Sequence, residues 1–395
     1  MEKLLILGAP VFQIEVVKKA KELGLYVGIV DINEDAPAMA YADETFVGSI
    51  IDFDGVLEVA RKFQPDGIIS GACDTSVVTA AKVREALGLP GYSVETAIRA
   101  TNKVKMLEAF EAHGVSHPLF QVVNKEDVNN FELTIPFPVI TKPTDSAGGR
   151  GVSIVKNSAE LHDAMLFSSN AGRSGNVLIE EYMAGPEVSV EVLVSGGVAH
   201  VLQVTDKLTS GEPNFYEVGH SQPSALPQDT KEKIKELAKA AVLSLGIDNS
   251  PAHVEIITTS EGPKMVELGA RLGGDCITSF LIDNSVSGVN MTAAAILLAL
   301  GQTPDISNYR DSGKSVAIKF IPTKKGLLKE IRNVEKASAM NGVIAVFITG
   351  KVGKSYEEAT DDSARFGYVV CEGATTKDAM ELCDKAISGI DFVLE

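Results

Sequence analysis

The sequence is short of basic residues. Its 395 positions hold 36 Lys and Arg against 53 Asp and Glu, which gives a formal net charge of −17. A chain this acidic repels nucleic acid and anionic membrane surfaces, so neither is expected as a partner. If the protein binds phosphates, it needs a locally positive site, and individual Lys and Arg positions therefore become informative.

The chain also lacks metal-type cysteine spacing and long apolar runs. Its cysteines (Cys73, Cys276, Cys371 and Cys383) form no CxxC pair, which favours reduced thiols in a cytoplasmic protein. The longest apolar run, residues 291–300, is far too short for a membrane span. The first ten residues are too short for a signal peptide and predict a strand instead.

The first 92 residues predict a parallel α/β domain. Buried strands alternate with helices, which is typical of a parallel sheet covered by helices. The strands are expected at residues 3–7, 25–30 and 67–70, and the helices at residues 11–23, 52–63 and 76–87. The first turn holds one glycine rather than G-x-G-x-x-G, which argues against a dinucleotide site. Asp31 ends a strand, where it could contact a ligand or simply cap a turn.

A glycine-rich loop follows the strand predicted at residues 136–143. The segment from Asp145 to Val152 (DSAGGRGV) connects it to another extended stretch, residues 153–155, so a hairpin is expected. The loop lacks the G-K-[ST] and the helix of a P-loop. Its glycines and hydroxyls can still offer N–H groups to a triphosphate, with Lys142 at its base, or it can be an ordinary turn. Lys103, near the start of a predicted helix, opposes the helix dipole, so it is either a ligand contact or a solvated lysine.

Acidic residues mark the strands that come next. The strand at residues 176–182 ends in Glu180-Glu181-Tyr182-Met183, and Glu187, Ser189 and Glu191 share one face of the following strand. These acids suit ribose hydroxyls or a solvated edge. Residues 207–227 predict a long ordered loop, interpreted as a lid, with Phe215, Tyr216 and His220 in it. A lone histidine is more often structural than catalytic.

Residues 250–275 predict a hairpin that ends in Arg-Leu-Gly-Gly-Asp. A turn at residues 260–263 that pairs Thr258 with Lys264 sets Glu255 opposite Glu267. Opposed Cβ atoms lie about 4.5–5.5 Å apart, so the two carboxylates repel unless a cation separates them. The alternatives are a Mg²⁺ site and two solvated glutamates. The tail, residues 306–395, predicts a small α+β domain with an N-cap signal before a helix at residues 376–390.

The order of these residues along the chain resembles the ATP-grasp superfamily, and the resemblance covers essentially the whole chain. The ordered set is Lys103, Lys142 with the glycine-rich loop, Glu180-Glu181-Tyr182-Met183, Glu187, and Glu255 and Glu267 with Arg271. VELGARLGGD and the tail GYVVCEGATTKDAMELCDKAI are most similar to L-amino acid (dipeptide) ligases. The resemblance implies an ATP-grasp fold with an N-terminal Rossmann-like α/β domain (residues 1–92), an ATP-grasp domain (93–305, small lobe about 115–185 and large lobe about 186–305) and a C-terminal α+β domain (306–395).

The resemblance also implies roles at matched positions. The residues that would bind ATP are Lys103, Lys142, Ser146, Gly148, Gly149, Gly151, Glu180, Glu181, Tyr182, Met183 and Glu187. Glu255 and Glu267 would bind Mg²⁺, with Mn²⁺ as an alternative. The residues that would act in catalysis are Arg271, Lys142, Glu267 and His220. Many members carry Asn where this chain has Gly269, so one metal ligand would differ.

The implied reaction joins a small-molecule carboxylate to an amine through an acylphosphate, with ADP and phosphate released. Amino acids are the expected substrates, with Cys73, Asp74, Phe215 and His220 as candidate specificity residues. A purine-biosynthesis ligase, of the phosphoribosylamine–glycine or carboxyaminoimidazole type, and a catalytically degenerate nucleotide-binding protein are the alternatives. Enzymes of this kind often form homodimers.

Overall fold

The computed structural model describes residues 1–145, 149–212 and 216–395. Its N-terminal sheet is fully parallel, in the order β3-β2-β1-β4. The strands are β1 (Lys3–Leu7), β2 (Tyr26–Asp31), β3 (Glu44–Val47) and β4 (Gly67–Ile69), and the helices are α1 (Ile14–Glu22), α2 (Phe53–Phe63) and α3 (Val77–Leu87). The predicted parallel α/β arrangement is confirmed, and β3 is a strand that the sequence did not predict.

Alternation along β1 explains how helices cover both faces of this sheet. Leu4 and Ile6 pack in one core with α1, whereas Leu5 and Leu7 pack in another with α2 and α3. Both sets are fully buried. A strand that is apolar on both faces requires a helical layer on each side, as in other parallel sheets.

A small antiparallel sheet, ordered β5-β8-β6-β7, follows two short helices. The elements are α4 (Val94–Arg99), α5 (Lys103–Ala112), β5 (Phe120–Val123), β6 (Val139–Pro143), β7 (Ser153–Val155), α6 (Ser158–Ala171) and β8 (Val177–Glu181). Strands β6 and β7 form the predicted hairpin around the glycine-rich loop. Three residues of that loop, 146–148, lie outside the described residues, and with them the predicted ligands Ser146 and Gly148.

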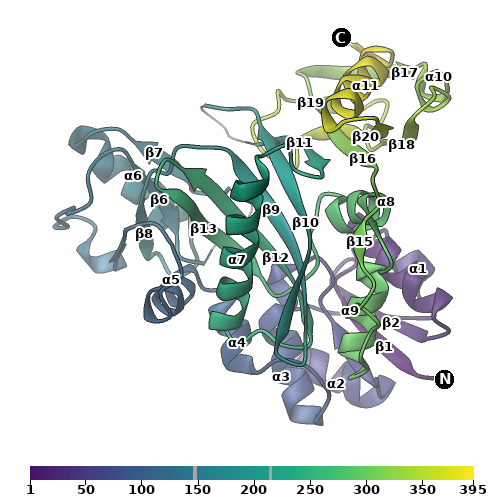
Figure 1. Ribbon diagram of the computed structural model, residues 1–395, viewed down its shortest axis with the longest axis horizontal. Coiled ribbons are helices and arrows are strands. Elements are labelled where there is room, and N and C mark those ends of the chain that lie inside the picture. Colours follow the sequence, from purple (N-terminus) through teal and green to yellow (C-terminus); the bar gives the residue numbers. More distant parts are fainter. Residues whose placement is uncertain (146–148, 213–215) are drawn as a thin grey trace.

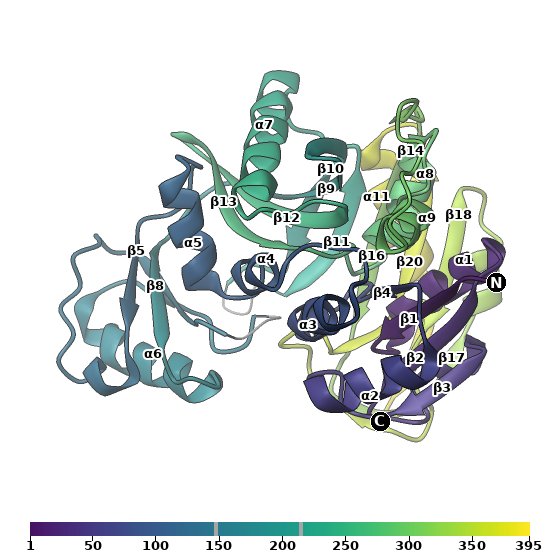
Figure 2. The same cartoon turned by 90° about the horizontal axis from the view of Figure 1, so that it is seen from below.

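The largest sheet runs β13-β12-β9-β10-β11-β16-β20-β18 and is antiparallel throughout. Its strands are β9 (Glu187–Ser195), β10 (Val198–Thr209), β11 (Glu217–Gln222), β12 (Ser250–Thr259), β13 (Gly262–Gly269), β16 (Ser315–Pro322), β18 (Val343–Ile348) and β20 (Arg365–Gly373). Helix α7 (Gln228–Ser244) packs on one part of the sheet, and α9 (Met291–Ala299) connects the sheet to the N-terminal domain. The small sheet and the N-terminal sheet lie on opposite sides of β9, β10 and β12 (Figures 1 and 2).

The predicted long loop at residues 207–227 is wrong. Strand β10 continues to Thr209, and β11 pairs with it from Glu217 onward. The segment reads as irregular because its two strands carry polar residues on a buried face, where apolar ones are usual. Phe215, which was interpreted as part of this lid, lies outside the described residues.

The remaining elements are short or belong to the C-terminal part of the chain. They are β14 (Val286–Ser287), β15 (Arg310–Asp311), β17 (Gly326–Arg332), β19 (Ser355–Tyr356), β21 (Asp391–Leu394), α8 (Asp283–Ser285), α10 (Val334–Ser338), α11 (Thr376–Ser388), a π-helix (Ile277–Ile282) and 3₁₀ turns (Val11–Gln13, Met39–Tyr41, Asp74–Ser76, Lys125–Asp127). The predicted N-cap of α11 is confirmed, since the Thr375 side chain accepts a hydrogen bond from the Asp378 N–H in a capping box. None of the described helices combines the length and apolarity that a membrane span requires.

Candidate active site

A cavity of about 700 Å³ opens between the small sheet and the edge of the large one. Nine of the predicted site residues line it: Lys103, Lys142, Gly149, Glu180, Glu181, Tyr182, Met183, Glu187 and Glu267. Apolar side chains complete its walls, namely Ile140, Val152, Ile154, Ile257 and Val266. The cavity therefore offers both apolar surface and charged groups of either sign.

The two predicted metal-ligand glutamates face each other as expected, but through an unexpected register. Glu255 pairs with Glu267, while the turn pairs Thr258 with Pro263 rather than with Lys264. A β-bulge between Glu255 and Ile256 absorbs the one-residue difference. A single-residue slip would otherwise have turned Glu267 to the opposite face.

Each lysine predicted to contact phosphates has a carboxylate partner within the cavity. Lys103 begins α5, whose N-cap Asn102 accepts a hydrogen bond from the Lys105 N–H, and its ammonium pairs with Glu267. Lys142 Nζ lies 2.6 Å from Glu180 Oε2, and both side chains are buried. The second Glu180 oxygen is buried without a hydrogen-bond partner among the described residues, so this carboxylate retains an acceptor for a ligand.

Lys207 is the centre of a charge cluster that the sequence did not predict. Its side chain is 5% exposed, and its Nζ lies 2.7 Å from Glu187, 3.0 Å from Glu217 and 3.3 Å from Glu255. Burial opposes the ammonium charge, but the three carboxylates keep the pKa of Lys207 well above its ordinary value. Burial likewise opposes the charge on Glu255, yet Lys207 and its neighbours hold the pKa of that carboxyl well below its usual range.

His253 extends this cluster along β12. Its Nδ1 lies 2.5 Å from Glu191 Oε1, and its Nε2 lies 3.4 Å from Glu255 Oε1. Burial would lower the pKa of His253, but Glu191 and Glu255 raise it to about 9. The imidazole is therefore a cation at neutral pH and stabilises the negative charge of Glu255.

Arg271 points toward the N-terminal domain rather than into the 700 Å³ cavity. Its Nε and Nη2 form a two-pronged pair with Asp74, at 2.9 and 2.8 Å from the carboxylate oxygens. A Cβ atom on Gly269 would lie 2.7 Å from Asp74 Oδ1. Gly269 thus makes room for the pair between Asp74 and Arg271, which gives a steric reason for the missing Asn.

A second cavity, of about 970 Å³, lies on the other side of this charge cluster. Its wall includes Phe12 from the N-terminal domain, Asp275, and Phe347 and Tyr368 from the C-terminal part. Arg365 also lines it, with Nη1 at 2.9 Å from Asp275 Oδ1 and its guanidinium over the Phe320 ring at 3.6 Å. Burial raises the pKa of Asp275 to about 6, although Arg365 opposes this shift.

His220 is fully buried on β11, with Nε2 at 3.1 Å from Glu217 Oε2 and its ring edge-on to Phe320. His220 is opposite Lys207 in the pairing of β10 with β11, and its side chain contacts Glu217, which suits a positioning residue. The structure thus adds Lys207, His253 and Arg365 to the residues around the site, and it gives Glu191 a partner in His253. The alternation of strand β10 could have revealed Lys207, whereas no local pattern could have paired Arg365 with a residue 90 positions away.

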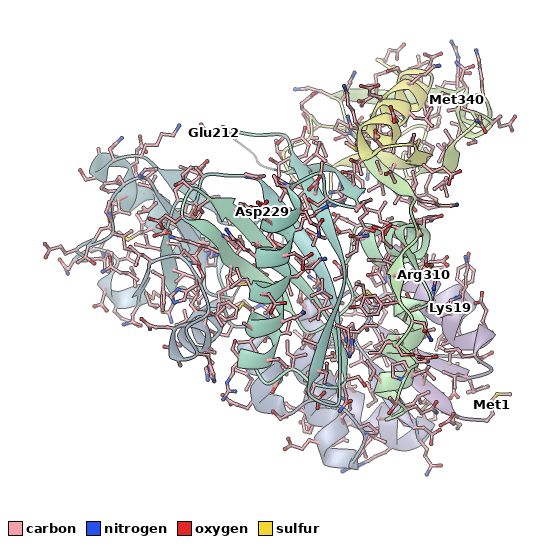
Figure 3. The ribbon with its side chains drawn as sticks, viewed as in Figure 1. Met1, Lys19, Glu212, Asp229, Arg310 and Met340 are labelled. Carbon is pink, nitrogen blue, oxygen red and sulfur yellow. The ribbon has the colours of Figure 1, made fainter. Side chains whose placement is uncertain are left out.

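Glu212 connects the two segments above the cavity. It lies at the tip of the β10–β11 hairpin (Figure 3), and its carboxylate is 2.9 Å from Lys156 Nζ, just after β7. Both residues line the 700 Å³ cavity and both are exposed. An exposed ion pair of this kind is weak, so it can open and close with little cost.

Comparison with known proteins gives this geometry its context. Residues 135–279 match the family described as the ATP-grasp domain. The chain contains an ATP-grasp domain. Residues 319–395 match the L-amino acid ligase C-terminal domain 2.

Several known proteins are similar to this chain. The formate-dependent phosphoribosylglycinamide formyltransferase of Prochlorococcus marinus (strain NATL2A) is 24% identical over 100% of this chain and 99% of its own. The alanine–anticapsin ligase of Bacillus subtilis (strain 168) is 29% identical over 55% of this chain and 51% of its own. The crystal structure of the L-amino acid ligase from Bacillus licheniformis has the same fold, with a TM-score of 0.88 and 22% identity over 100% and 99% of the two chains. Together these findings support an ATP-grasp carboxylate–amine ligase.

Proposed function

We propose that this protein is an ATP-dependent ligase that joins the carboxylate of one amino acid to the amine of another, releasing ADP and phosphate. The observation that carries the proposal is the 700 Å³ cavity, in which Lys103 and Lys142 meet the β12–β13 hairpin that carries Glu255 and Glu267. A second cavity, which reaches the C-terminal part, flanks it. The match of residues 319–395 to an amino acid ligase domain supports the choice of substrate class.

The nucleotide would occupy the 700 Å³ cavity. The apolar side chains of Ile140, Ile154 and Ile257 suit the faces of a purine, and Tyr182 and Met183 follow directly after β8 to offer backbone groups to its edge. Lys103 and Lys142 would meet phosphate oxygens, exchanging their present carboxylate partners for the ligand. Gly149 and Gly151 have φ of +69° and +76°, which suits close approach of backbone N–H groups to phosphates.

The facing glutamates fit a hard divalent cation. Carboxylate oxygens are the donors that Mg²⁺ prefers, and Glu255 remains ionised because Lys207 and His253 stabilise its charge. Glu255 and Glu267 would hold the metal, and the metal would neutralise the charge that develops on the transferred phosphoryl group. Since Gly269 supplies no side chain, water would complete the coordination.

The substrates would enter from the 970 Å³ cavity. Amino acids are zwitterions with an ammonium and a carboxylate, and the cavity wall carries acids (Asp275, Asp362) beside a guanidinium (Arg365). Aromatic residues on the same wall would contact an amino acid side chain. The Arg271 guanidinium would bind a carboxylate if it exchanged Asp74 for the substrate.

A free carboxylate is a poor acyl donor because its leaving group would be oxide. Transfer of the γ-phosphoryl group to one carboxylate oxygen gives an acylphosphate, and the attacking amine then forms a C–N bond while the C–O bond to phosphate breaks. The amine needs to lose a proton before or during attack. The acylphosphate reacts with water, so the Lys156–Glu212 contact above the cavity would help to exclude solvent.

The proposal is tested by a panel of amino acid pairs in which release of ADP and formation of an amide are measured together, with and without Mg²⁺. At least one pair should give Mg²⁺-dependent ADP and stoichiometric amide. ATP binding without turnover on any pair would refute the ligase and leave a nucleotide-binding protein. Lys233→Met, which changes an exposed lysine on α7, serves as a control that should leave turnover unchanged.

A purine-pathway ligase is the second candidate, because the phosphoribosylglycinamide relatives align over the whole chain. Against it stands the acidic character of the second cavity, where Glu357, Glu358, Asp361 and Asp362 outnumber the nearby basic side chains. A phosphoribosyl substrate would need a more basic wall. ADP release with glycinamide ribonucleotide and formate, but with no amino acid pair, would favour this alternative. The predicted homodimer and cytoplasmic location stay predictions.

A further inference from the structure

Arg84 is a buried cation with no counterion among residues 1–145, 149–212 and 216–395. It lies on α3, is 6% exposed, and forms no ion pair with any carboxylate of the described part of the chain. Its Nε and Nη2 are buried, and neither donates a hydrogen bond to another described residue. An unpaired guanidinium in a protein interior is costly, since both its charge and its N–H groups have been removed from water.

Two neighbours hold the guanidinium in place. Its Cζ stacks over the Tyr92 ring at 4.4 Å. On another side, a Cβ atom on Gly91 would lie 2.7 Å from the same Cζ, which shows how closely the backbone approaches. The face of Tyr92 attracts the cation, but this attraction supplies no hydrogen-bond acceptor for Nε and Nη2.

A small cavity adjoins this guanidinium. The volume open to a water-sized sphere is about 20 Å³. The wall includes Arg84, Tyr92, Ser70, Ser250 and Arg271. That volume admits one water molecule or one monatomic anion. Two charged side chains line this cavity, Arg84 and Arg271. Asp74 neutralises the charge of Arg271, so the positive charge of Arg84 remains.

We propose that this cavity binds a single small monovalent anion, of the size and charge of chloride, between Arg84 and the segment that carries Arg271. A halide would accept hydrogen bonds from Nε and Nη2 and cancel the remaining positive charge, whereas water would supply acceptors but no charge. Sulfate, phosphate and amino acid carboxylates are too large for the space.

The anion would also stabilise a junction between domains. Tyr92 donates a hydrogen bond from its hydroxyl to the Ala270 carbonyl at 3.1 Å, and the Leu272 N–H donates to the Gly71 carbonyl at 3.0 Å. Both contacts flank Arg271. The inference does not rest on the proposed ligase activity, because it concerns only the charge and space around Arg84.

The first test is crystallographic and uses the wild-type protein grown in sodium bromide. An anomalous bromine peak in this cavity, within hydrogen-bonding distance of Arg84 Nε, is the expected result. A water molecule there, with no anomalous signal at bromide concentrations of about 0.2 M, would overturn the proposal. This test does not depend on whether any variant folds.

The second test measures melting temperature in sodium chloride and in sodium gluconate at equal ionic strength, so that screening is the same in both. The wild type should melt about 1–2 °C higher in chloride once its concentration is ten times the dissociation constant. Arg84→Gln should lose this difference, and the matched control Arg61→Gln, at an exposed position on α2, should keep it. An equal chloride effect in Arg84→Gln and the wild type would contradict the assignment.

Discussion

Replacement of Lys207 by methionine should destabilise the protein strongly. Three carboxylates lie within 3.3 Å of its Nζ, and the side chain is almost fully buried. Methionine keeps most of the volume but leaves three buried acids without their shared cation. Removing one partner of a buried ion pair costs about 3–5 kcal/mol. His220, which lies 3.1 Å from Glu217, contacts only one of the three.

The pH dependence of this loss has a defined sign. Because Lys207 holds the pKa values of Glu217 and Glu255 below their ordinary range, those groups contribute stability above the unfolded-state pKa of about 4.3 and lose it as the pH falls. The deficit of Lys207→Met should therefore be largest near pH 7 and shrink below about pH 4. Added Mg²⁺ should restore part of it, since the metal supplies charge beside Glu255.

The chain has no tryptophan, so circular dichroism is the suitable probe of melting. Lys207→Met should melt roughly 5 °C or more below the wild type at pH 7. Lys233→Met, at an exposed position, should melt with the wild type. If Lys207→Met also melts within about 1 °C of the wild type, then Lys207 does not hold the cluster together and the electrostatic reasoning fails.

Three further predictions concern residues around the same site. Glu267→Gln should lower Mg²⁺-dependent ADP release by about 100-fold or more while ATP still binds, and unchanged turnover would remove Glu267 from the metal site. Asp74→Asn should lower stability by about 1.5–3 kcal/mol, measured by thermal melting, because Arg271 loses its carboxylate partner. The raised pKa of His253, about 9, means that its contribution to stability is full below about pH 6.5 and is lost as the pH rises through 9. His253→Gln should therefore flatten the decline in melting temperature over that range, and an unaltered decline would show that another group causes it.

The hairpin at residues 250–269 shows how far sequence reasoning can reach. The opposition of Glu255 and Glu267 was predicted correctly, yet the turn pairing that led to it was wrong by one residue. A bulge corrected the register. Bulges of this kind depend on side-chain packing across the sheet, which a single sequence does not display.

Other features depended on contacts between distant segments. The sequence predicts a loop around Lys207 because the strands there bury charged and polar residues, and that burial is tolerable only where several opposite charges meet. Arg365 lies on a strand whose sequence carries no sign of its partner Asp275, and the sequence of α3 does not indicate that Arg84 is buried. Gly269 was noticed as a departure from the family pattern, but only the position of Asp74 explains it.

The most direct test of the ligase account follows oxygen from the carboxylate substrate into phosphate. An amino acid pair that supports amide formation is incubated with ATP and Mg²⁺, with both oxygens of the donor carboxylate labelled as ¹⁸O. The account predicts one ¹⁸O in the released phosphate and one in the amide for every ADP formed, because phosphate leaves from an acylphosphate. Amide formation with unlabelled phosphate, or ADP release without amide for every pair, would contradict it.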